Sequence, residues 1–166
     1  SFVMEESKPI KGKESKSIFI IDPIDGTTNF MHGNPNFAIS IAAEVNDRLE
    51  AALIYSPITD EMFIAERGKG AFLNDKRIRV ASRKKLSESL LVTGIPHIGR
   101  GNKELFLKEM KQLIPEVAGI RRSGSAALDL AWIASGRYDI FWERGLKIWD
   151  IAAGILLVRE AGGFAQ

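Results

Sequence analysis

Two aspartates separated by two residues are the chemically most informative feature of the 166-residue sequence. They follow the apolar run at 18–21, in a segment that reads Asp22-Pro23-Ile24-Asp25-Gly26-Thr27-Thr28. Because Gly26 permits a tight turn, both carboxylates and the Ile24 carbonyl can converge on one point. Oxygen-only ligands at that density suit Mg²⁺. The backbone amides from Thr27 onward could bind a phosphate at the start of a short helix.

A purely structural interpretation competes with this one. Aspartates commonly cap and turn the chain, and two of them at this spacing, taken alone, more often do only that. The strand that precedes the two aspartates and the Gly-Thr-Thr that follows them make a metal and phosphate site the favoured interpretation. The pair Glu5-Glu6, taken alone, is typical of a solvated surface. Asp150 precedes an apolar helix and could be its N-cap, a metal ligand, or both.

Composition narrows the available chemistry. The chain has no cysteine and two histidines, which excludes a disulfide framework, a thiolate nucleophile and a cysteine zinc site. Carboxylates, hydroxyls, backbone groups and a hard metal ion remain. The net charge of +2 is too small to indicate nucleic acid or a membrane surface, and no apolar stretch approaches the about 20 residues of a membrane span. The missing cysteines weakly favour a cytoplasmic location.

The elements that must position these residues fall into two groups. In the first half, apolar and alternating runs bounded by turn residues predict largely antiparallel strands, at 18–21, 37–45, 49–55, 61–66, 70–73 and 77–80. In the second half, helical periodicity and end signals predict helices with a strand among them, namely helices at 102–114, 125–135 and 151–161 and a strand at 138–142. The last helix is apolar nearly all round, so it should be buried between layers. We expect a mixed α/β sandwich.

Three separated segments together resemble a known family. Residues 22–30 read DPIDGTTNF, residues 149–154 read WDIAAG, and Glu5-Glu6-Ser7 precedes both. They resemble the signatures of the inositol monophosphatase family of Mg²⁺-dependent, lithium-sensitive phosphatases, with its bacterial inositol-1-monophosphatase branch nearest. The resemblance extends along the chain. It implies one domain over residues 1–166, with approximate halves 1–92 and 93–166, and the layered αβαβα sandwich of the sugar phosphatases.

The resemblance also implies a role for ten residues. The ligands of the metal ions would be Glu5, Asp22, Ile24 through its carbonyl, Asp25 and Asp150. The residues that contact the phosphate or the sugar alcohol would be Gly26, Thr27, Gly124, Ala126, Glu143 and Asp150. The catalytic groups would be Glu5, Asp25 and Thr27. Asp22 would be shared between two ions, which sets their spacing at about 3.5–4 Å.

The function implied is Mg²⁺-dependent hydrolysis of myo-inositol monophosphate by water, without a covalent intermediate, in a homodimer. One alternative keeps the metal site and changes the substrate to fructose 1,6-bisphosphate or a nucleotide bisphosphate, with Arg144 and Lys147 as conceivable suppliers of a second cationic pocket. Another is a binding role on RNA or the transcription machinery through the basic clusters at 8–16 and 83–85, although such clusters are usually solvated.

The ends of the chain depart from the family pattern. The family has an N-terminal helical segment ahead of Glu5, which supplies a further acidic residue, and closing C-terminal elements. We therefore expect the sequence to be a piece of a longer protein, truncated at both ends, and we expect a protein cut to these residues to be poorly active.

Overall fold

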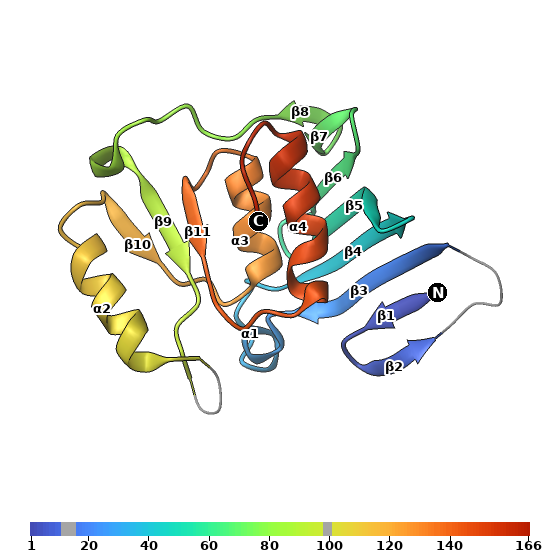
Figure 1. Ribbon diagram of the computed structural model, residues 1–166, viewed down its shortest axis with the longest axis horizontal. Helices are drawn as coiled ribbons and strands as arrows, with labels where there is room; N and C mark the ends of the chain where they lie inside the picture. The colour runs from blue at the N-terminus through green and yellow to red at the C-terminus, as the bar shows by residue number, and fades with distance from the viewer. Residues whose placement is uncertain (11–15, 98–100) are drawn as a thin grey trace.

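The chain forms two β-sheets with helices between and outside them (Figure 1). The computed structural model describes residues 1–10, 16–97 and 101–166. In chain order the elements are β1 (Phe2–Met4), β2 (Ser7–Ile10), β3 (Ser17–Asp25), α1 (Thr27–Met31), β4 (Ala38–Val45), β5 (Arg48–Ser56), β6 (Glu61–Glu66), β7 (Gly70–Leu73), β8 (Lys76–Ile78), a 3₁₀ turn (Leu86–Glu88), β9 (Leu90–Thr93), α2 (Lys103–Leu113), β10 (Gly119–Arg121), α3 (Ala126–Ala134), β11 (Ile140–Trp142) and α4 (Ile148–Glu160). In these ranges, no helix is long and apolar enough to cross a bilayer.

The first half of the chain forms an eight-stranded sheet. Its order is β2-β1-β3-β4-β5-β6-β7-β8, and every neighbouring pair is antiparallel except β1 and β3, which run parallel. The turn between β4 and β5 places Asn46 and Asp47 at φ 51° and 59°, the left-handed conformation that such a two-residue turn requires. The predicted antiparallel sheet is confirmed.

The second sheet is short and parallel. Its order is β10-β9-β11, with both pairs parallel. The carboxyl ends of parallel strands meet at one edge of a sheet, where open α/β folds place their ligands. The residues that directly follow these strands, Gly94, Arg122 and Glu143, all line one pocket.

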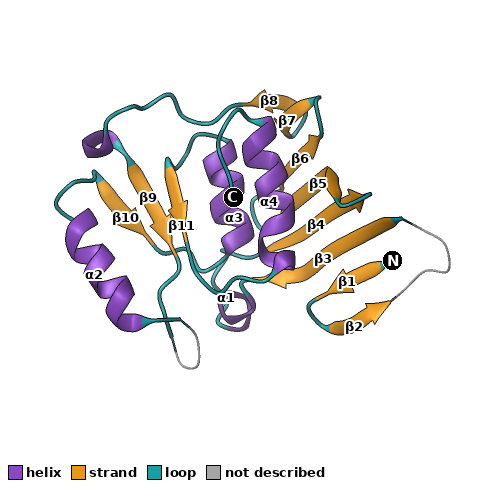
Figure 2. Cartoon of the chain, viewed as in Figure 1, coloured by secondary structure: helices purple, strands orange, loops and turns teal. Residues whose placement is uncertain are grey.

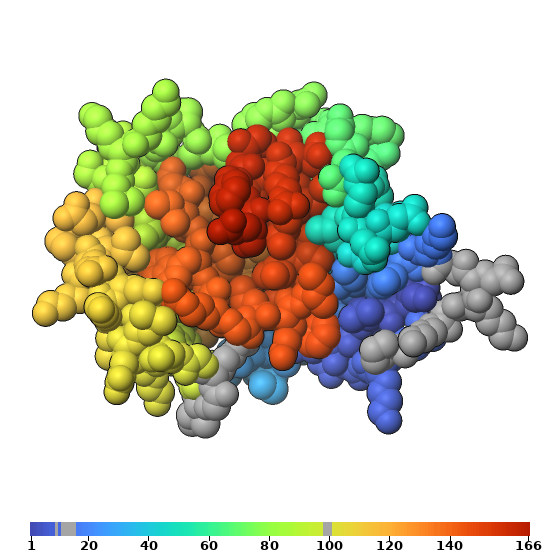
Figure 3. Space-filling model, in the orientation of Figure 1, coloured from blue at the N-terminus to red at the C-terminus, as the bar shows by residue number. Residues whose placement is uncertain are grey.

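Helices α3 and α4 lie between the two sheets, and α2 packs on the outer side of the small sheet (Figure 2). The space-filling view shows the same order, with the orange and red segments of α3 and α4 between the yellow α2 and the cyan and blue strands (Figure 3). The described residues therefore form four layers, β-α-β-α. The further outer helical layer of the expected αβαβα sandwich is not found among them.

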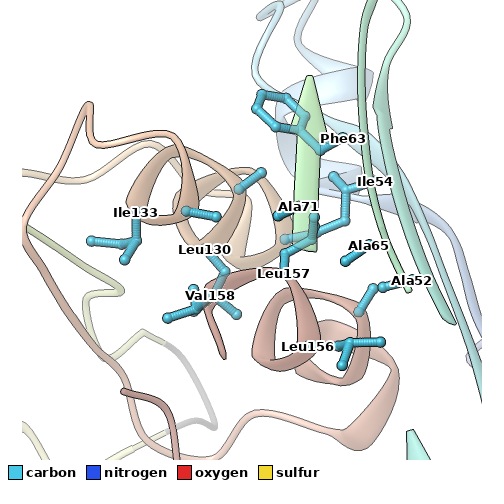
Figure 4. Packing of buried hydrophobic residues seen from close by; sticks show 14 of the residues in the cluster. Ala52, Ile54, Phe63, Ala65, Ala71, Leu130, Ile133, Leu156, Leu157 and Val158 are labelled. Carbon is cyan, nitrogen blue, oxygen red and sulfur yellow. The ribbon is translucent and has the colours of Figure 1, made fainter. Parts of the chain in front are cut away.

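The core sits between the large sheet and the two central helices (Figure 4). Leu156 and Leu157 of α4 face buried sheet residues, which include Ala52, Ile54, Phe63, Ala65 and Ala71. Leu130 of α3 lies between the two helices, and Ile133 points away from the large sheet. The expectation that the apolar C-terminal helix is buried is confirmed. Small residues on the sheet let the helices approach closely.

Gly154 marks the tightest point between α3 and α4. A Cβ at this position would overlap the Leu130 side chain. Gly154→Ala is therefore expected to lower the free energy of unfolding by up to about 2 kcal/mol, because overpacking costs about 1–3 kcal/mol while alanine gains about 1 kcal/mol of helix propensity. Urea unfolding measures this loss. In a Leu130→Ala background the same change should instead raise the free energy of unfolding by up to about 1 kcal/mol, because only the gain in helix propensity remains. An equal loss in both backgrounds would contradict the packing argument.

The sequence-based boundaries need several corrections. Strands β1, β2, β9 and β10 were not expected, and the strand predicted at 138–142 begins only at Ile140. The strand predicted at 77–80 ends at Ile78. The helix at 102–114 is confirmed, with the Asn102 side chain accepting the Leu105 amide at 3.0 Å.

Candidate active site and metal centre

A β-bulge places Asp22 and Asp25 on the same face of the large sheet. Strand β3 continues through Pro23 and Ile24, where a loop was expected, and its register shifts so that Asp22 pairs with Ser40 and Asp25 with Ala38. Between these two pairs the chain advances by three residues on β3 and by two on β4, which defines a β-bulge. Residues three apart on a regular strand point to opposite faces, and the extra residue removes that conflict. Both carboxyl groups are consequently buried toward the helical layer.

The N-terminus of α3 anchors Asp25. Its Oδ2 accepts a hydrogen bond from the Ser125 hydroxyl at 2.6 Å and one from the Ala127 amide at 2.7 Å. Ser125 is the N-cap of this helix, and its hydroxyl also accepts from the Leu128 amide at 3.3 Å. The carboxylate therefore has one fixed orientation, which a ligand of a small cation requires.

Asp150 comes from the first turn of α4. Asp150 is not the N-cap residue, which was one of the alternatives from the sequence, because the helix begins at Ile148 and Asp150 is the third helical residue. Its Oδ2 instead accepts the backbone N–H of Lys147, the residue before the helix, at 2.7 Å. This bond satisfies one of the free amides at the helix start and fixes the carboxylate toward Asp22 and Asp25. Carboxylate oxygens of these three residues lie within 4.8 Å of one another.

Glu5 reaches the same place from the parallel strand pair. Met4 of β1 pairs with Ile21 of β3, and the Glu5 amide donates to the Ile21 carbonyl at 3.4 Å. This register sets Glu5 beside Asp22, and both line one pocket. Glu5 is exposed whereas the aspartates are buried, so it forms the open edge of the acidic cluster.

Burial and mutual repulsion shift the titration of the cluster. Burial raises the pKa of Asp22 well above its ordinary value of 3.8, and the charges of Asp25 and Glu5 raise it further. Burial also raises the pKa of Asp25 to about 6, although the hydrogen bonds from Ser125 and Ala127 oppose the shift. Packed carboxylates repel one another. A cation placed among them would relieve both the repulsion and the burial penalty.

The donor set fits a hard divalent cation. The three clustered side chains offer carboxylate oxygens only, and the Ile24 carbonyl lies in the same pocket. Ca²⁺ and Mg²⁺ prefer such oxygen ligands, whereas a zinc site would normally contain imidazole or thiolate. The Thr27 hydroxyl donates to the Ile24 carbonyl at 3.0 Å, and a carbonyl has a second lone pair for a metal.

A glycine turn follows the cluster and begins α1. Gly26 has φ 91° and precedes the helix at Thr27. A Cβ on it would lie 2.9 Å from the Asn36 carbonyl and 3.2 Å from that of Gly124, so both the conformation and the space demand glycine. The Asn29 amide fixes this turn against the segment before α3 by donating to the Asn36 and Ser123 carbonyls, at 2.6 and 2.9 Å.

All ten residues singled out from the sequence line a single pocket of about 200 Å³. The members of this set are Glu5, Asp22, Ile24, Asp25, Gly26, Thr27, Gly124, Ala126, Glu143 and Asp150. They come from the first 27 residues and from residues 124–150, so the fold joins two distant parts of the described chain in one site.

The side of the pocket opposite the glycine turn lies at the ends of β9 and β11. Thr93 pairs with Trp142, which brings Gly94 next to Glu143. A Cβ on Gly94 would overlap the Glu143 carboxyl group, so glycine leaves the space that this carboxylate occupies. The Thr93 hydroxyl donates to the Trp142 carbonyl at 2.6 Å and ties the two strand ends together.

Sequence reasoning missed Asp129. This aspartate of α3 is 1% exposed and lines the pocket. The Ser123 hydroxyl donates to its Oδ1 at 2.5 Å, and burial raises its pKa to about 7. The available signal was an aspartate within an otherwise apolar helix, since a buried charge in such a position needs a partner.

The outer wall of the pocket combines aromatic rings with an ion pair. The rings of Phe106 and Trp142 stack with centroids 6.2 Å apart, and both line the pocket together with Arg144. Both terminal nitrogens of Arg144 contact Glu109 of α2, at 2.7 and 2.6 Å. His97 also lines the pocket.

The fold and the site define a mixed α+β protein with a buried carboxylate cluster suited to divalent cations, and comparisons identify its family. A sequence model of the inositol monophosphatase family matches residues 1–165. The chain is 56% identical over 164 residues to inositol-1-monophosphatase from Rhizobium meliloti, covering 99% of this chain and 62% of that protein. It is 51% identical over 157 residues to Nus factor SuhB of Pseudomonas aeruginosa, covering 93% and 58%.

A solved structure agrees with these matches. The extragenic suppressor protein suhB from Bartonella henselae superimposes with a TM-score of 0.95 and 56% identity, over 98% of this chain and 62% of that one. The chain belongs to the inositol monophosphatase family. It spans about three-fifths of the length of the curated relatives that it matches, with 62% for the Rhizobium protein.

Proposed function

We propose that the protein hydrolyses phosphate monoesters of small polyols with Mg²⁺, and that myo-inositol monophosphate is its substrate. The observation that carries the proposal is the convergence of Asp22, Asp25 and Asp150 within 4.8 Å, next to the glycine turn in one pocket. The family match and the name of the Rhizobium relative support the substrate.

The acidic residues would hold the metal ions. Glu5, Asp22 and the Ile24 carbonyl would bind one ion, the three buried aspartates a second, and Glu5 a third, weakly bound ion. Mg²⁺, when bound, would supply a more acidic water and stabilise the charge that spreads over the phosphoryl oxygens. The repulsion that raises the pKa of Asp22 supports this assignment, because a cation compensates it.

The remaining residues would orient the reactants. The Gly26 and Thr27 amides would donate to the phosphate, and Thr27 and Glu5 would orient the attacking water in line with the leaving alcohol. Water would give up a proton and form the new bond to phosphorus, the bond between phosphorus and the ester oxygen would break, and the leaving alkoxide oxygen would take up a proton to become the alcohol. No side chain is needed as a nucleophile, so no covalent intermediate forms.

Small and acidic residues would receive the polyol. Glu143 would accept a hydrogen bond from a substrate hydroxyl. Gly124 and Ala126 would line the ring, and their small side chains leave the room that it needs. The position of all three on the walls of one pocket supports these roles.

The decisive experiment compares phosphate release from three substrates. Mg²⁺-dependent release from myo-inositol 1-phosphate is expected to exceed release from fructose 1,6-bisphosphate and from a nucleotide bisphosphate, as judged by kcat/KM. Chelation by EDTA should stop the reaction and Li⁺ should inhibit it. Undiminished turnover in EDTA would refute the metal assignment, and faster turnover of either bisphosphate would refute the substrate.

A second function in transcription is favoured by the relative named Nus factor SuhB. The basic clusters of the sequence offer limited support. Arg83 is paired with Asp139 at 2.7 Å and Lys85 with Glu88 at 3.4 Å, while Lys11 and Lys13 lie outside the described residues. Binding to RNA polymerase or RNA, measured for an inactive Asp25→Asn variant, would separate this role from catalysis.

The homodimer and the cytoplasmic location belong to the same proposal. Family membership supports both. Light scattering on the purified protein is expected to give twice the monomer mass, and a monomer at micromolar concentration would refute the dimer.

A further inference from the structure

Arg144 is the cation best placed to receive a second phosphate on the outer wall of the pocket. It lines the pocket together with Trp142 and Glu143, and an arginine binds phosphate oxygens through two parallel N–H groups. Lys147, the other conceivable supplier, is not among the described lining residues. Arg122 also lines the pocket, but it lies against Gly124 beside the glycine turn. A bisphosphate that placed one phosphate on the glycine turn would therefore meet the Arg144 guanidinium with the other.

In the structure, the Arg144 guanidinium is already paired with the carboxylate of Glu109. The Arg144 Nη1 donates to Glu109 Oε2 at 2.7 Å and its Nη2 to Oε1 at 2.6 Å, a paired geometry that satisfies both terminal nitrogens. The Trp142 indole N–H donates to the same Oε2 at 3.3 Å. The Arg144 hydrogen bond and charge accordingly lower the pKa of Glu109, which keeps it ionised.

Glu109 neutralises a residue of the pocket wall from a position outside the pocket. Glu109 belongs to α2 and does not itself line the pocket. It forms its hydrogen bonds to Arg144 without lining the pocket. Phe106 and Trp142, whose rings stack on each other, line the pocket beside Arg144. A second phosphate on this wall would have to replace two charge-assisted hydrogen bonds and would meet the negative charge of Glu109. An uncharged polyol meets no such penalty.

We propose that Glu109 is a specificity-determining residue that restricts the enzyme to monophosphates by neutralising Arg144. This inference rests on the proposed function and deepens it, since it names the feature of the substrate that the pocket rejects. The chain offers a matched control in Glu61, which forms the same two-pronged pair with Arg137 and does not line the pocket.

The test compares myo-inositol 1,4-bisphosphate with myo-inositol 1-phosphate as substrates of the purified protein. Glu109→Gln keeps an acceptor for Trp142 but removes the charge. It is expected to raise the ratio of kcat/KM for the bisphosphate to that for the monophosphate about tenfold, the scale of one hydrogen bond to a charged group. Glu61→Gln should leave the ratio within about twofold of that of the unmodified protein.

Two further variants test whether the gain acts through Arg144. Arg144→Met alone should not raise the ratio, because the unpaired charge of Glu109 would still repel a second phosphate, and combining it with Glu109→Gln should cancel the gain. An unchanged ratio in a folded Glu109→Gln variant would overturn the proposal, as would a gain that survives in the double variant. If Glu109→Gln does not fold, a rise in the ratio for Arg144→Met overturns the proposal, and an unchanged or lower ratio supports it.

A binding measurement separates this inference from the proposed function. The rise in Tm produced by each of the two inositol phosphates, with Mg²⁺ present, reports binding without turnover. Should no variant release phosphate, the proposed function fails. A larger gain in Tm from the bisphosphate in Glu109→Gln than in the unmodified protein still supports selection by Glu109, and equal gains overturn it.

Discussion

Replacing Asp25 by asparagine is expected to leave a folded protein that no longer releases phosphate in the presence of Mg²⁺. The change removes one of three clustered charges and keeps an oxygen that can accept from Ser125 and Ala127. We expect kcat/KM to fall by more than the about 10–100-fold loss that is typical when a group behind a metal ligand is changed. Initial rates with myo-inositol 1-phosphate measure it.

Stability measurements on the same variant separate loss of the metal from misfolding. Because Asp25 is buried beside other carboxylates, its neutralisation should make the metal-free protein more stable at pH 8 while reducing the stabilisation by Mg²⁺. Loss of activity through misfolding would lower stability instead. Asp75→Asn is a matched control, since Asp75 is exposed in a turn at φ 64° that asparagine tolerates. A preserved rate in Asp25→Asn would contradict the site assignment.

The metal-free protein is expected to become less stable as the pH rises from about 5 to 8. The pKa of Asp25 is about 6 and that of Asp129 about 7, both above the ordinary value of 3.8, and that of Asp22 is also raised. The folded state therefore holds protons that the unfolded state has already lost, so the free energy of unfolding falls across this window. Asp25 alone accounts for about 1.4 kcal/mol of this change, because about half of the about 3 kcal/mol that its raised pKa represents is lost below pH 5.

Urea unfolding in EDTA and in Mg²⁺ at several pH values measures this dependence. Mg²⁺ should restore most of the lost stability at pH 8 and little at pH 5, where protons already occupy the carboxylates. In Asp25→Asn the fall with pH should be shallower. A metal-free protein that is equally stable at pH 5 and pH 8 would contradict the electrostatic description of the cluster.

Local signals predicted much of the site. The strand before Asp22, the glycine turn and the serine that begins α3 are all features of neighbouring residues. The structure contains all three, although the strand continues through Asp25. The alternatives at Asp150 stayed open because an aspartate serves equally well at the N-cap or in the first helical turn. Sequence alone does not distinguish two positions that both satisfy free amides at the helix start.

Contacts between distant elements could not be predicted in the same way. The short strands β9 and β10 are stable only through parallel pairing with partners far along the chain, so their residues carry little periodic signal. The pair between Glu109 and Arg144 joins α2 to the segment after β11, and no spacing rule connects residues 35 positions apart. Asp129 was missed for a related reason, since its partner Ser123 lies outside the helix that contains it.

The bulge in β3 makes the proposed metal site depend on the number of residues between its two aspartates more than on which residues they are. Its extra residue keeps Asp22 and Asp25 on one face while the Ile24 carbonyl still reaches the pocket. Deleting one residue would leave the two carboxylates on that face but would remove the irregularity that frees this carbonyl. Inserting one would turn the second carboxylate away or shift every side chain beyond it. Natural variation between the two aspartates should therefore consist of substitutions, with insertions and deletions confined to the hairpin ends.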